Sequence, residues 1–119
     1  MLGNAVFRVL SEDPGLHVFG TVRRIESSRF FVSELASRLI VVDNLECYNQ
    51  LKQLFATQNP NVVINCTALR EPMASDAINS INIYSLLPHR LEHLCRLHGV
   101  RLIQISTDGV RPTIKRCKY

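Results

Sequence analysis

The sequence has 119 residues, of which 46% are hydrophobic and 20% charged, as is typical of one globular α/β domain. No apolar run approaches the roughly 18 to 20 residues that span a bilayer, and no charged and apolar leader follows Met1. These features exclude a membrane-spanning chain and predict a cytoplasmic protein with no membrane partner.

The formal net charge of +4 is concentrated in a short tail. The last nine residues hold no acidic residue and four basic ones, namely Arg111, Lys115, Arg116 and Lys118. Without these four, ten basic residues face ten acidic ones, so the rest of the chain is neutral. We therefore expect residues 111–119 to form a disordered basic tail, and we expect no nucleic-acid partner.

The four cysteines are scattered along the chain and form no CxxC pair. This spacing predicts neither a zinc site nor a disulfide framework. We expect plain buried thiols at most of these positions, which are Cys47, Cys66, Cys95 and Cys117.

Apolar runs alternate with helical patterns up to about Val110, which predicts βαβ units and a parallel sheet. The first helix has Ala5, Val6, Val9 and Leu10 on one face and ends at Pro14-Gly15. Strands are then predicted at residues 17–22 and 38–42. A further helix carries Tyr48, Leu51, Leu54 and Phe55 on one face, and Asp43 or Asn44 is placed to cap it.

The second half of the chain continues the alternation. Residues 61–65 (NVVIN) hold an apolar run that ends at Asn65, which predicts a central strand covered by helices on both faces. A long helix is expected from Asp76 to His98, with Pro88 as a potential kink and Gly99 as its C-terminal cap. Its predicted buried residues are Ile81, Leu87, Leu91, Leu94 and Cys95, and residues 100–106 form the last predicted strand.

Together these elements predict a Rossmann-type α/β domain over residues 1–110, with helices on both faces of a parallel sheet. Such a sheet normally begins with a strand whose following turn carries a glycine-rich phosphate loop. Here the sequence opens directly on a helix. We therefore expect a truncated domain that lacks the first strand and the C-terminal substrate region.

Three motifs in this order resemble those of dTDP-4-dehydrorhamnose reductases, which belong to the extended short-chain dehydrogenases. The motifs are MLGNA at residues 1–5, VVINCTA at residues 62–68 and LIQISTDGV at residues 102–110. The resemblance implies binding of a nicotinamide dinucleotide and of a nucleotide-sugar substrate. It covers essentially residues 1–110, and the sequence after Val110 departs from the family pattern, as a frameshift, a premature stop or an authentic basic tail would produce.

The resemblance also implies roles for individual residues. Leu2 and Gly3 correspond to the end of the loop that holds the pyrophosphate at a helix N-terminus. Arg23 and Arg24 follow a strand where relatives hold the adenosine ribose, and guanidinium groups there favour a 2′-phosphate, so NADP(H) is the expected cofactor. A solvated turn is the alternative for these two arginines.

The remaining implied positions follow the later strands. Asp43 and Asn44 would contact the adenine edge, with a helix cap as the competing role. Small residues would let the cofactor lie against the backbone at Cys66, Thr67 and Ala68, and Ser106 would lie next to it. Thr107 corresponds to the family's catalytic Ser/Thr, whose hydroxyl binds the substrate carbonyl while a tyrosine and a lysine further along complete the set. Tyr119 is the only tyrosine after Thr107 in this sequence, and no lysine follows it here.

Two other pairs at helical spacing suggest chemistry but have simpler explanations. Tyr48 and Lys52 match a Tyr-x-x-x-Lys pair, yet they precede Thr107 and Tyr48 belongs to an apolar stripe. His89 and His93 share a helix face without a convincing third ligand, so no metal site is predicted. Asn82 resembles an asparagine that relatives place near the active site, and an exposed polar position is the alternative.

The sequence thus predicts a fragment of an NADPH-dependent reductase of a 4-keto nucleotide sugar, converting dTDP-4-dehydrorhamnose to dTDP-rhamnose in its complete form. Because the catalytic tyrosine and lysine are absent, we expect the chain to be inactive alone. Alternatives are an epimerase or dehydratase of another nucleotide sugar, a non-catalytic dinucleotide-binding subunit, and a gene remnant without activity. A homodimer is left open as the state of assembly.

Overall fold

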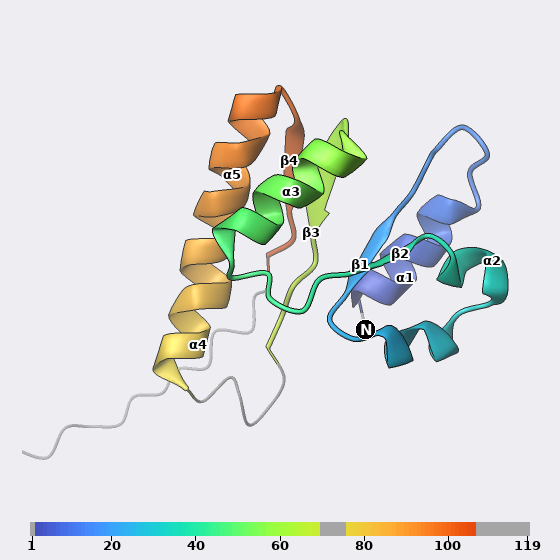
Figure 1. Cartoon of the computed structure of the whole chain (residues 1–119), viewed down its shortest axis with the longest axis horizontal. Helices are drawn as coiled ribbons and strands as arrows, with labels where there is room; N and C mark the ends of the chain where they lie inside the picture. The colour runs from blue at the N-terminus through green and yellow to red at the C-terminus, as the bar shows by residue number, and fades with distance from the viewer. Residues whose placement is uncertain (1, 70–75, 107–119) are drawn as a thin grey trace, which may run out of the picture.

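The computed structural model describes residues 2–69 and 76–106. Their elements alternate between helices and strands, as the sequence predicts, and form a mixed α/β fold consistent with a partial Rossmann domain (Figure 1). The strands form two parallel pairs, β1 (Gly20–Val22) with β2 (Leu39–Val41) and β3 (Val62–Asn65) with β4 (Arg101–Gln104). Among the described residues, no hydrogen-bonded ladder joins one pair to the other.

The N-terminal region is built from one regular helix and several short elements. Helix α1 (Leu2–Ser11) precedes β1, and a 3₁₀ helix η1 (Ile25–Phe30) and a single turn α2 (Ser33–Ala36) connect β1 to β2. The predicted strands were longer than those observed, which are only three residues each. The polar sequence between them, left without regular structure in the prediction, forms these two short helices.

The apolar stripe predicted for α1 is not its buried face. Phe7 is the buried residue of this helix, whereas Ala5 is exposed and Val9 is 64% exposed. Phe7 packs against Phe31 edge-to-face, with ring centroids 5.5 Å apart. It also approaches Gly20 so closely that a Cβ there would lie 3.3 Å from its ring, so the absence of a side chain at this position lets α1 lie against β1.

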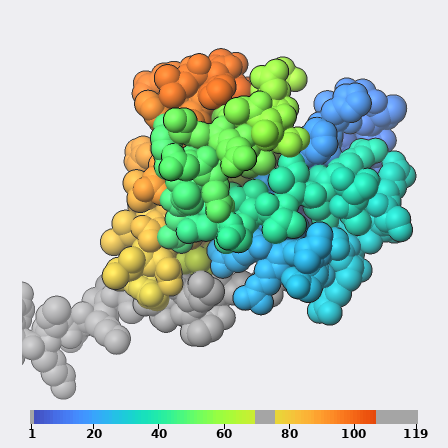
Figure 2. All heavy atoms as spheres, viewed as in Figure 1, coloured from blue at the N-terminus to red at the C-terminus, as the bar shows by residue number. Residues whose placement is uncertain are grey.

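The C-terminal region holds the core. Helix α3 (Tyr48–Gln58) precedes β3, and a continuous helical segment of α4 (Ala77–Ile81), η3 (Asn82–Leu86) and α5 (Leu87–His98) precedes β4. Helices α3 and α5 pack side by side over β3 and β4, and together they form much of the front surface of this region (Figures 1 and 2). Their buried cluster comprises Leu51, Phe55, Ile83, Leu87, Leu91, Leu94 and Cys95.

The long predicted helix exists, with a local change of geometry that the sequence pattern did not predict. Asp76 caps it by accepting a hydrogen bond from the Ile78 N–H, and Gly99 ends it with φ of 66°, as expected for a left-handed cap. Residues 82–86 form a wider π turn, and Pro88 lies at the start of α5 directly after it. This turn shifts the helical register, so Ile83 is buried and Ile81, predicted as core, is 60% exposed.

Strands β3 and β4 divide their side chains between two faces, as strand geometry requires. Val63 and Leu102 pack against the cluster formed by α3 and α5. Ile64 and Ile103 point to the opposite face, where together with residues of α1 they line an apolar hollow. Helices therefore lie on both faces of this strand pair, but the prediction that residues 61–65 form a central strand is not met, because β3 pairs only with β4 in the described residues.

Candidate functional site

The site predicted from the sequence lies at the carboxyl ends of the strands. In each parallel pair the two strands end together, with Val22 beside Val41 and Asn65 beside Gln104. The amino end of α1 lies at the same side of the molecule as these strand ends (Figure 1). In open α/β sheets, ligands bind in the crevice outside the carboxyl ends of the strands.

Gly3 lies where α1 begins, against the end of β3. A Cβ added at Gly3 would be 3.3 Å from the Cβ of Cys66, which is closer than most such contacts in proteins. Only glycine, which has no side chain, fits this approach without a shift of the segment that contains Cys66. In dinucleotide-binding folds the last glycine of the phosphate loop serves close packing between helix and strand, and Gly3 is placed for that role. Leu2, beside it, is 52% exposed.

Arg23 and Arg24 directly follow β1, and both are exposed. Arg24 lines an open hollow of about 580 Å³ together with residues of η1. Two guanidinium groups, those of Arg24 and Arg29, and one carboxylate, that of Glu26, belong to this hollow, so its charged groups carry a net positive charge. A ribose phosphate fits this charge, since guanidinium groups bind phosphate oxygens in a fixed fork geometry.

Asp43 and Asn44 follow β2 and are exposed, but neither caps the next helix. Helix α3 begins at Tyr48 after Cys47, whose side chain makes no capping hydrogen bond. Asn44 instead stabilises its own turn, accepting at Oδ1 from the Glu46 N–H at 2.8 Å, while its N–H donates to Gln50 Oε1 at 3.3 Å. The predicted helix cap is thus wrong, because three residues separate Asn44 from the start of the helix at Tyr48.

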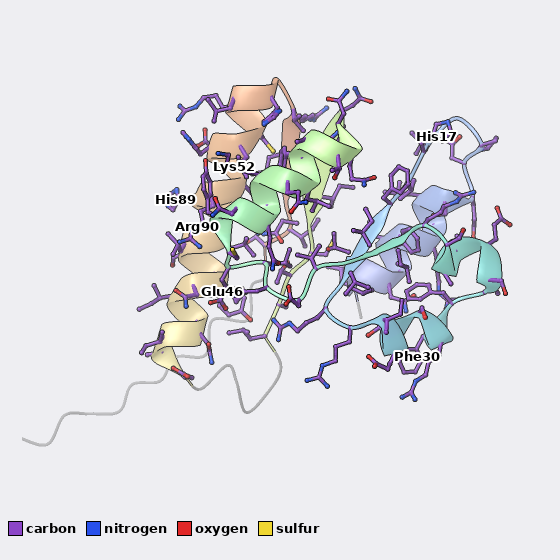
Figure 3. The ribbon with its side chains drawn as sticks, viewed as in Figure 1. His17, Phe30, Glu46, Lys52, His89 and Arg90 are labelled. Atoms are coloured by element: carbon purple, nitrogen blue, oxygen red, sulfur yellow. The ribbon has the colours of Figure 1, made fainter. Side chains whose placement is uncertain are left out.

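Glu46 ties this turn to the helix that precedes β4, a role that the sequence analysis missed. Asn82 Nδ2 donates to Glu46 Oε2 at 3.1 Å, and the guanidinium of Arg90 donates to the Glu46 carbonyl oxygen. Figure 3 shows Glu46 near the start of α3, on the side where Arg90 projects from α5. Asn82 therefore supports the loop after β2. This contact could not be predicted from local spacing, because it joins residues far apart in the sequence.

Cys66, Thr67 and Ala68 follow β3, as predicted, in a turn that Asn65 stabilises. The buried Asn65 accepts at Oδ1 from the Thr67 N–H at 3.1 Å and donates from Nδ2 to Gln104 Oε1 at 2.8 Å. Tyr84 of the π turn accepts at its hydroxyl from the Leu69 N–H at 3.0 Å. Asn65, Gln104 and Tyr84 were not predicted as site residues, although a polar residue that ends an apolar strand, as Asn65 does, is a readable signal.

Burial raises the pKa of the Cys66 thiol above its ordinary value of 9.0. The thiol is therefore neutral near pH 7 and acts as a small, half-buried residue. This state suits the predicted role of Cys66 as a site of little bulk and disfavours nucleophilic chemistry, which needs the thiolate.

Ser106 follows β4 and is exposed. The predicted catalytic residue Thr107 and the predicted basic tail at residues 111–119 lie outside the described residues. Their roles stay predictions.

One member of each competing pair makes a packing contact, and the other member, Lys52 or His89, is exposed. Tyr48 packs against the core cluster, and its ring lies 6.4 Å from that of His93, whereas Lys52 is exposed on α3. Within residues 2–69 and 76–106, no group of three side chains could hold a metal ion, and no helix is long and apolar enough to cross a membrane.

These features are typical of a dinucleotide-binding α/β fold, with a close glycine at a helix start, basic residues after the first observed strand and small residues after β3. The sequence matches the NAD dependent epimerase/dehydratase family over residues 1–116, and the chain belongs to this family. The matched segment extends into the basic tail. No curated protein and no solved structure matches the chain.

Proposed function

We propose that this chain provides the NADP(H)-binding part of a reductase that acts on a 4-keto nucleotide sugar, with dTDP-4-dehydrorhamnose as the substrate. Membership of the family supports a nicotinamide dinucleotide as cofactor and a reaction of the epimerase/dehydratase class. The finer assignment to a reductase rests on the resemblance of the motifs at residues 1–5, 62–68 and 102–110.

The hollow beside Arg24 is the observation that carries the choice of NADP(H). It lies directly after β1 and is lined by the guanidinium groups of Arg24 and Arg29, while Arg23 lies next to it in sequence but not in its lining. The 2′-phosphate distinguishes NADP(H) from NAD(H). Arg23 and Arg24 would hold this phosphate, while Asp43 and Asn44 would contact the adenine. Leu2 and Gly3 would place the pyrophosphate at the start of α1, where free N–H groups favour an anion.

The same proposal assigns the groups nearest the reacting atoms. Cys66, Thr67, Ala68 and Ser106 would flank the cofactor where β3 and β4 end, and the Thr107 hydroxyl would donate a hydrogen bond to the substrate carbonyl. The bound dinucleotide supplies the hydride. The hydrogen bonds of Asn65 to Thr67 and Gln104 fix the two strand ends relative to each other, which would hold these groups in place.

Binding of two nucleotide fragments to the 119-residue chain tests the cofactor assignment. Adenosine 2′,5′-bisphosphate carries the 2′-phosphate and adenosine 5′-monophosphate lacks it, so calorimetric titration of both isolates this one group. We expect the bisphosphate to bind more tightly by about tenfold or more, since a hydrogen bond to a charged group contributes roughly 1.5 to 3 kcal/mol.

Arg24→Ala should remove most of this preference, and Arg23→Ala with Arg24→Ala should abolish it. Arg38→Ala is the matched control, because it removes one positive charge whose guanidinium already pairs with Glu34 at 3.0 Å. Equal affinities for the two fragments, or an unchanged preference in the double variant, would show that these arginines do not select NADP(H).

A further inference from the structure

The π turn η3 contacts two loops that follow different strands. Asn82 Nδ2 donates to Glu46 Oε2 at 3.1 Å in the loop after β2. Two residues later, the Tyr84 hydroxyl accepts from the Leu69 N–H at 3.0 Å in the loop after β3. Ile83, between them, is 2% exposed and belongs to the core cluster. Residues two apart in a helix do not face the same way, so one turn reaches both loops while its middle residue stays in the core.

Each loop also packs a leucine beside its polar contact with η3. Leu45 directly precedes Glu46, and both Leu45 and Leu69 are half-buried against the cluster that contains Ile83. Apolar burial is non-directional, so it keeps a loop near the helix without fixing its orientation. A hydrogen bond has a preferred distance and angle and supplies that orientation. The two loops are therefore attached to the same turn by the same combination of contacts.

Each hydrogen bond of η3 lies close to a residue of the proposed cofactor site. The Glu46 N–H donates to Asn44 Oδ1 at 2.8 Å, so Asn82 is linked to Asn44 through Glu46. On the other side, Leu69 directly follows Ala68. Asn44 and Ala68 are proposed contacts of the dinucleotide, and neither is bound by η3 itself. The turn thus acts on them through their neighbours.

The strand ladders do not fix these two loops relative to each other. Among residues 2–69 and 76–106, β2 pairs only with β1 and β3 only with β4, so no backbone ladder joins the strands that lead into the two loops. Side-chain contacts through η3 therefore contribute to the distance between the loops. A ligand that spans both loops gains affinity when that distance is set before it binds, because less ordering is then needed on binding.

We infer that η3 is a clamp, in which Asn82 and Tyr84 hold the loop after β2 and the loop after β3 at a fixed separation, and that both are positioning residues for the dinucleotide. The inference rests on the proposed function, which places the adenine at the first loop and the reacting end of the cofactor at the second. Neither side chain needs to touch the ligand. Loss of either hydrogen bond weakens the binding of a ligand that spans both loops and spares a fragment that contacts one of them.

Hydrogen exchange in the 119-residue chain without ligand, read by NMR, tests the clamp directly. Tyr84→Phe removes the hydroxyl and keeps the ring, which is 46% exposed, so the core is not opened. Exchange at the Leu69 amide should become faster by about threefold or more, because the amide loses its acceptor. Tyr48→Phe is the matched control, since it removes the hydroxyl of a tyrosine that packs on the same cluster from α3, and it should leave Leu69 unchanged.

The clamp also predicts an effect across the turn. Asn82→Ala should accelerate exchange at the Glu46 amide and, to a smaller extent, at Leu69, because both loops are attached to one turn. Tyr84→Phe should do the converse. Glu46→Gln keeps a carbonyl oxygen as acceptor for Asn82 and should preserve the exchange at both amides.

Two nucleotides distinguish a positioning role from a loss of stability. Adenosine 2′,5′-bisphosphate represents the adenosine end and needs only the loops after β1 and β2, whereas NADP⁺ spans both loops of the clamp. In calorimetric titrations, Asn82→Ala and Tyr84→Phe should each lower the affinity for NADP⁺ by about threefold or more and leave that for the bisphosphate within about twofold. Glu46→Gln should retain the affinities of the unsubstituted chain for both nucleotides.

An equal loss of affinity for both nucleotides would overturn the inference, because general destabilisation weakens both. Unchanged exchange at Leu69 in Tyr84→Phe, or an equal acceleration in Tyr48→Phe, would also overturn it. So would effects confined to the substituted side of the turn, since two independent contacts do not form a clamp. If neither nucleotide binds the unsubstituted chain, the proposed function fails and with it the positioning role, while the exchange data still decide whether η3 couples the two loops.

Discussion

The N-terminal region, residues 2–43, and the C-terminal region, residues 44–106, bury their apolar side chains to very different extents. Among the described residues of the N-terminal region, the buried apolar ones are Phe7 and Val42. The C-terminal region contains one contiguous cluster of seven buried residues. Both regions hold one parallel strand pair and similar apolar sequence. The difference lies in the helices that cover the strands.

Helices α3 and α5 have 11 and 12 residues, enough for three turns and a continuous apolar stripe. The helices that connect β1 to β2 have six and four residues and bury none of their side chains. A short helix loses backbone conformational entropy on folding but covers too little of a strand face to bury much apolar surface. Strand pairing alone therefore does not produce a core.

The largest expected effect comes from opening a cavity in the C-terminal cluster. Leu94 is 1% exposed, and Leu94→Ala should lower the free energy of unfolding by about 2 to 5 kcal/mol, because the lost burial and the cavity both contribute. Urea unfolding followed by circular dichroism measures it. Leu97→Ala, on the same helix but 66% exposed, should stay within about 0.5 kcal/mol. Equal losses for both variants would contradict the assignment of the core.

Phe7→Ala tests whether the N-terminal region depends on one side chain. Phe7 packs on Gly20 and Phe31, and its loss should cost about 2 to 3 kcal/mol, below the upper range for a fully enclosed ring because few other buried residues surround it. Hydrogen exchange should accelerate at Gly20 and Val22 while the α5 amides near Leu91 keep their protection. Faster exchange in both regions would show that the chain unfolds as one unit.

The success of the sequence analysis follows the same division. The sequence predicts the faces of α3 and α5, the start of the long helix near Asp76 and its end at Gly99, because long helices with regular periodicity carry a repeated signal. The capping role of the Asp76 side chain was not predicted. The position of β3 is predicted closely, whereas the predicted lengths of β1, β2 and β4 are too long. The sequence analysis missed η1 and α2, since single turns have too few residues to show a period.

Some features could not be read from local sequence at all. The π turn at residues 82–86 moves Ile83 inward in place of Ile81, and no residue in NIYSL indicates that shift. The contact of Glu46 with Asn82 joins residues 36 positions apart. The positions after each strand were predictable because the carboxyl ends of parallel strands meet at one edge, whereas the polar residues that hold those ends depend on tertiary contacts.

Asn65→Ala tests the polar contribution to the better packed region. The substitution removes the buried Asn65 side chain, which pairs with the N–H of the half-buried Thr67 and with the exposed Gln104 side chain. The loss of both hydrogen bonds should cost about 1 to 3 kcal/mol. Gln53→Ala, an exposed position on α3, is the control and should be nearly neutral. Thermal unfolding of both variants measures the difference, and a neutral Asn65→Ala would mean that water replaces these hydrogen bonds.

The smallest expected effect tests the close approach between the two regions, at Gly3. Gly3→Ala adds a Cβ 3.3 Å from the Cβ of Cys66, so either the start of α1 or the segment at Cys66 must move by a few tenths of an ångström. Against this cost, alanine is favoured over glycine in a helix by up to about 1 kcal/mol, with less gain in the first turn. The two effects should leave a net change within about 1 kcal/mol.

The pair can be separated by a double-mutant cycle with Cys66→Gly, which removes the opposing Cβ. If the contact limits Gly3→Ala, the double variant should recover stability relative to the sum of the single ones by about 0.5 kcal/mol or more. Gly15→Ala provides a control outside the contact, because its added Cβ would meet only the flexible Asp13 carboxylate at 3.2 Å. Strict additivity in chemical unfolding would show that α1 and the end of β3 are not energetically coupled, and that the two regions adjoin without stabilising each other at this point.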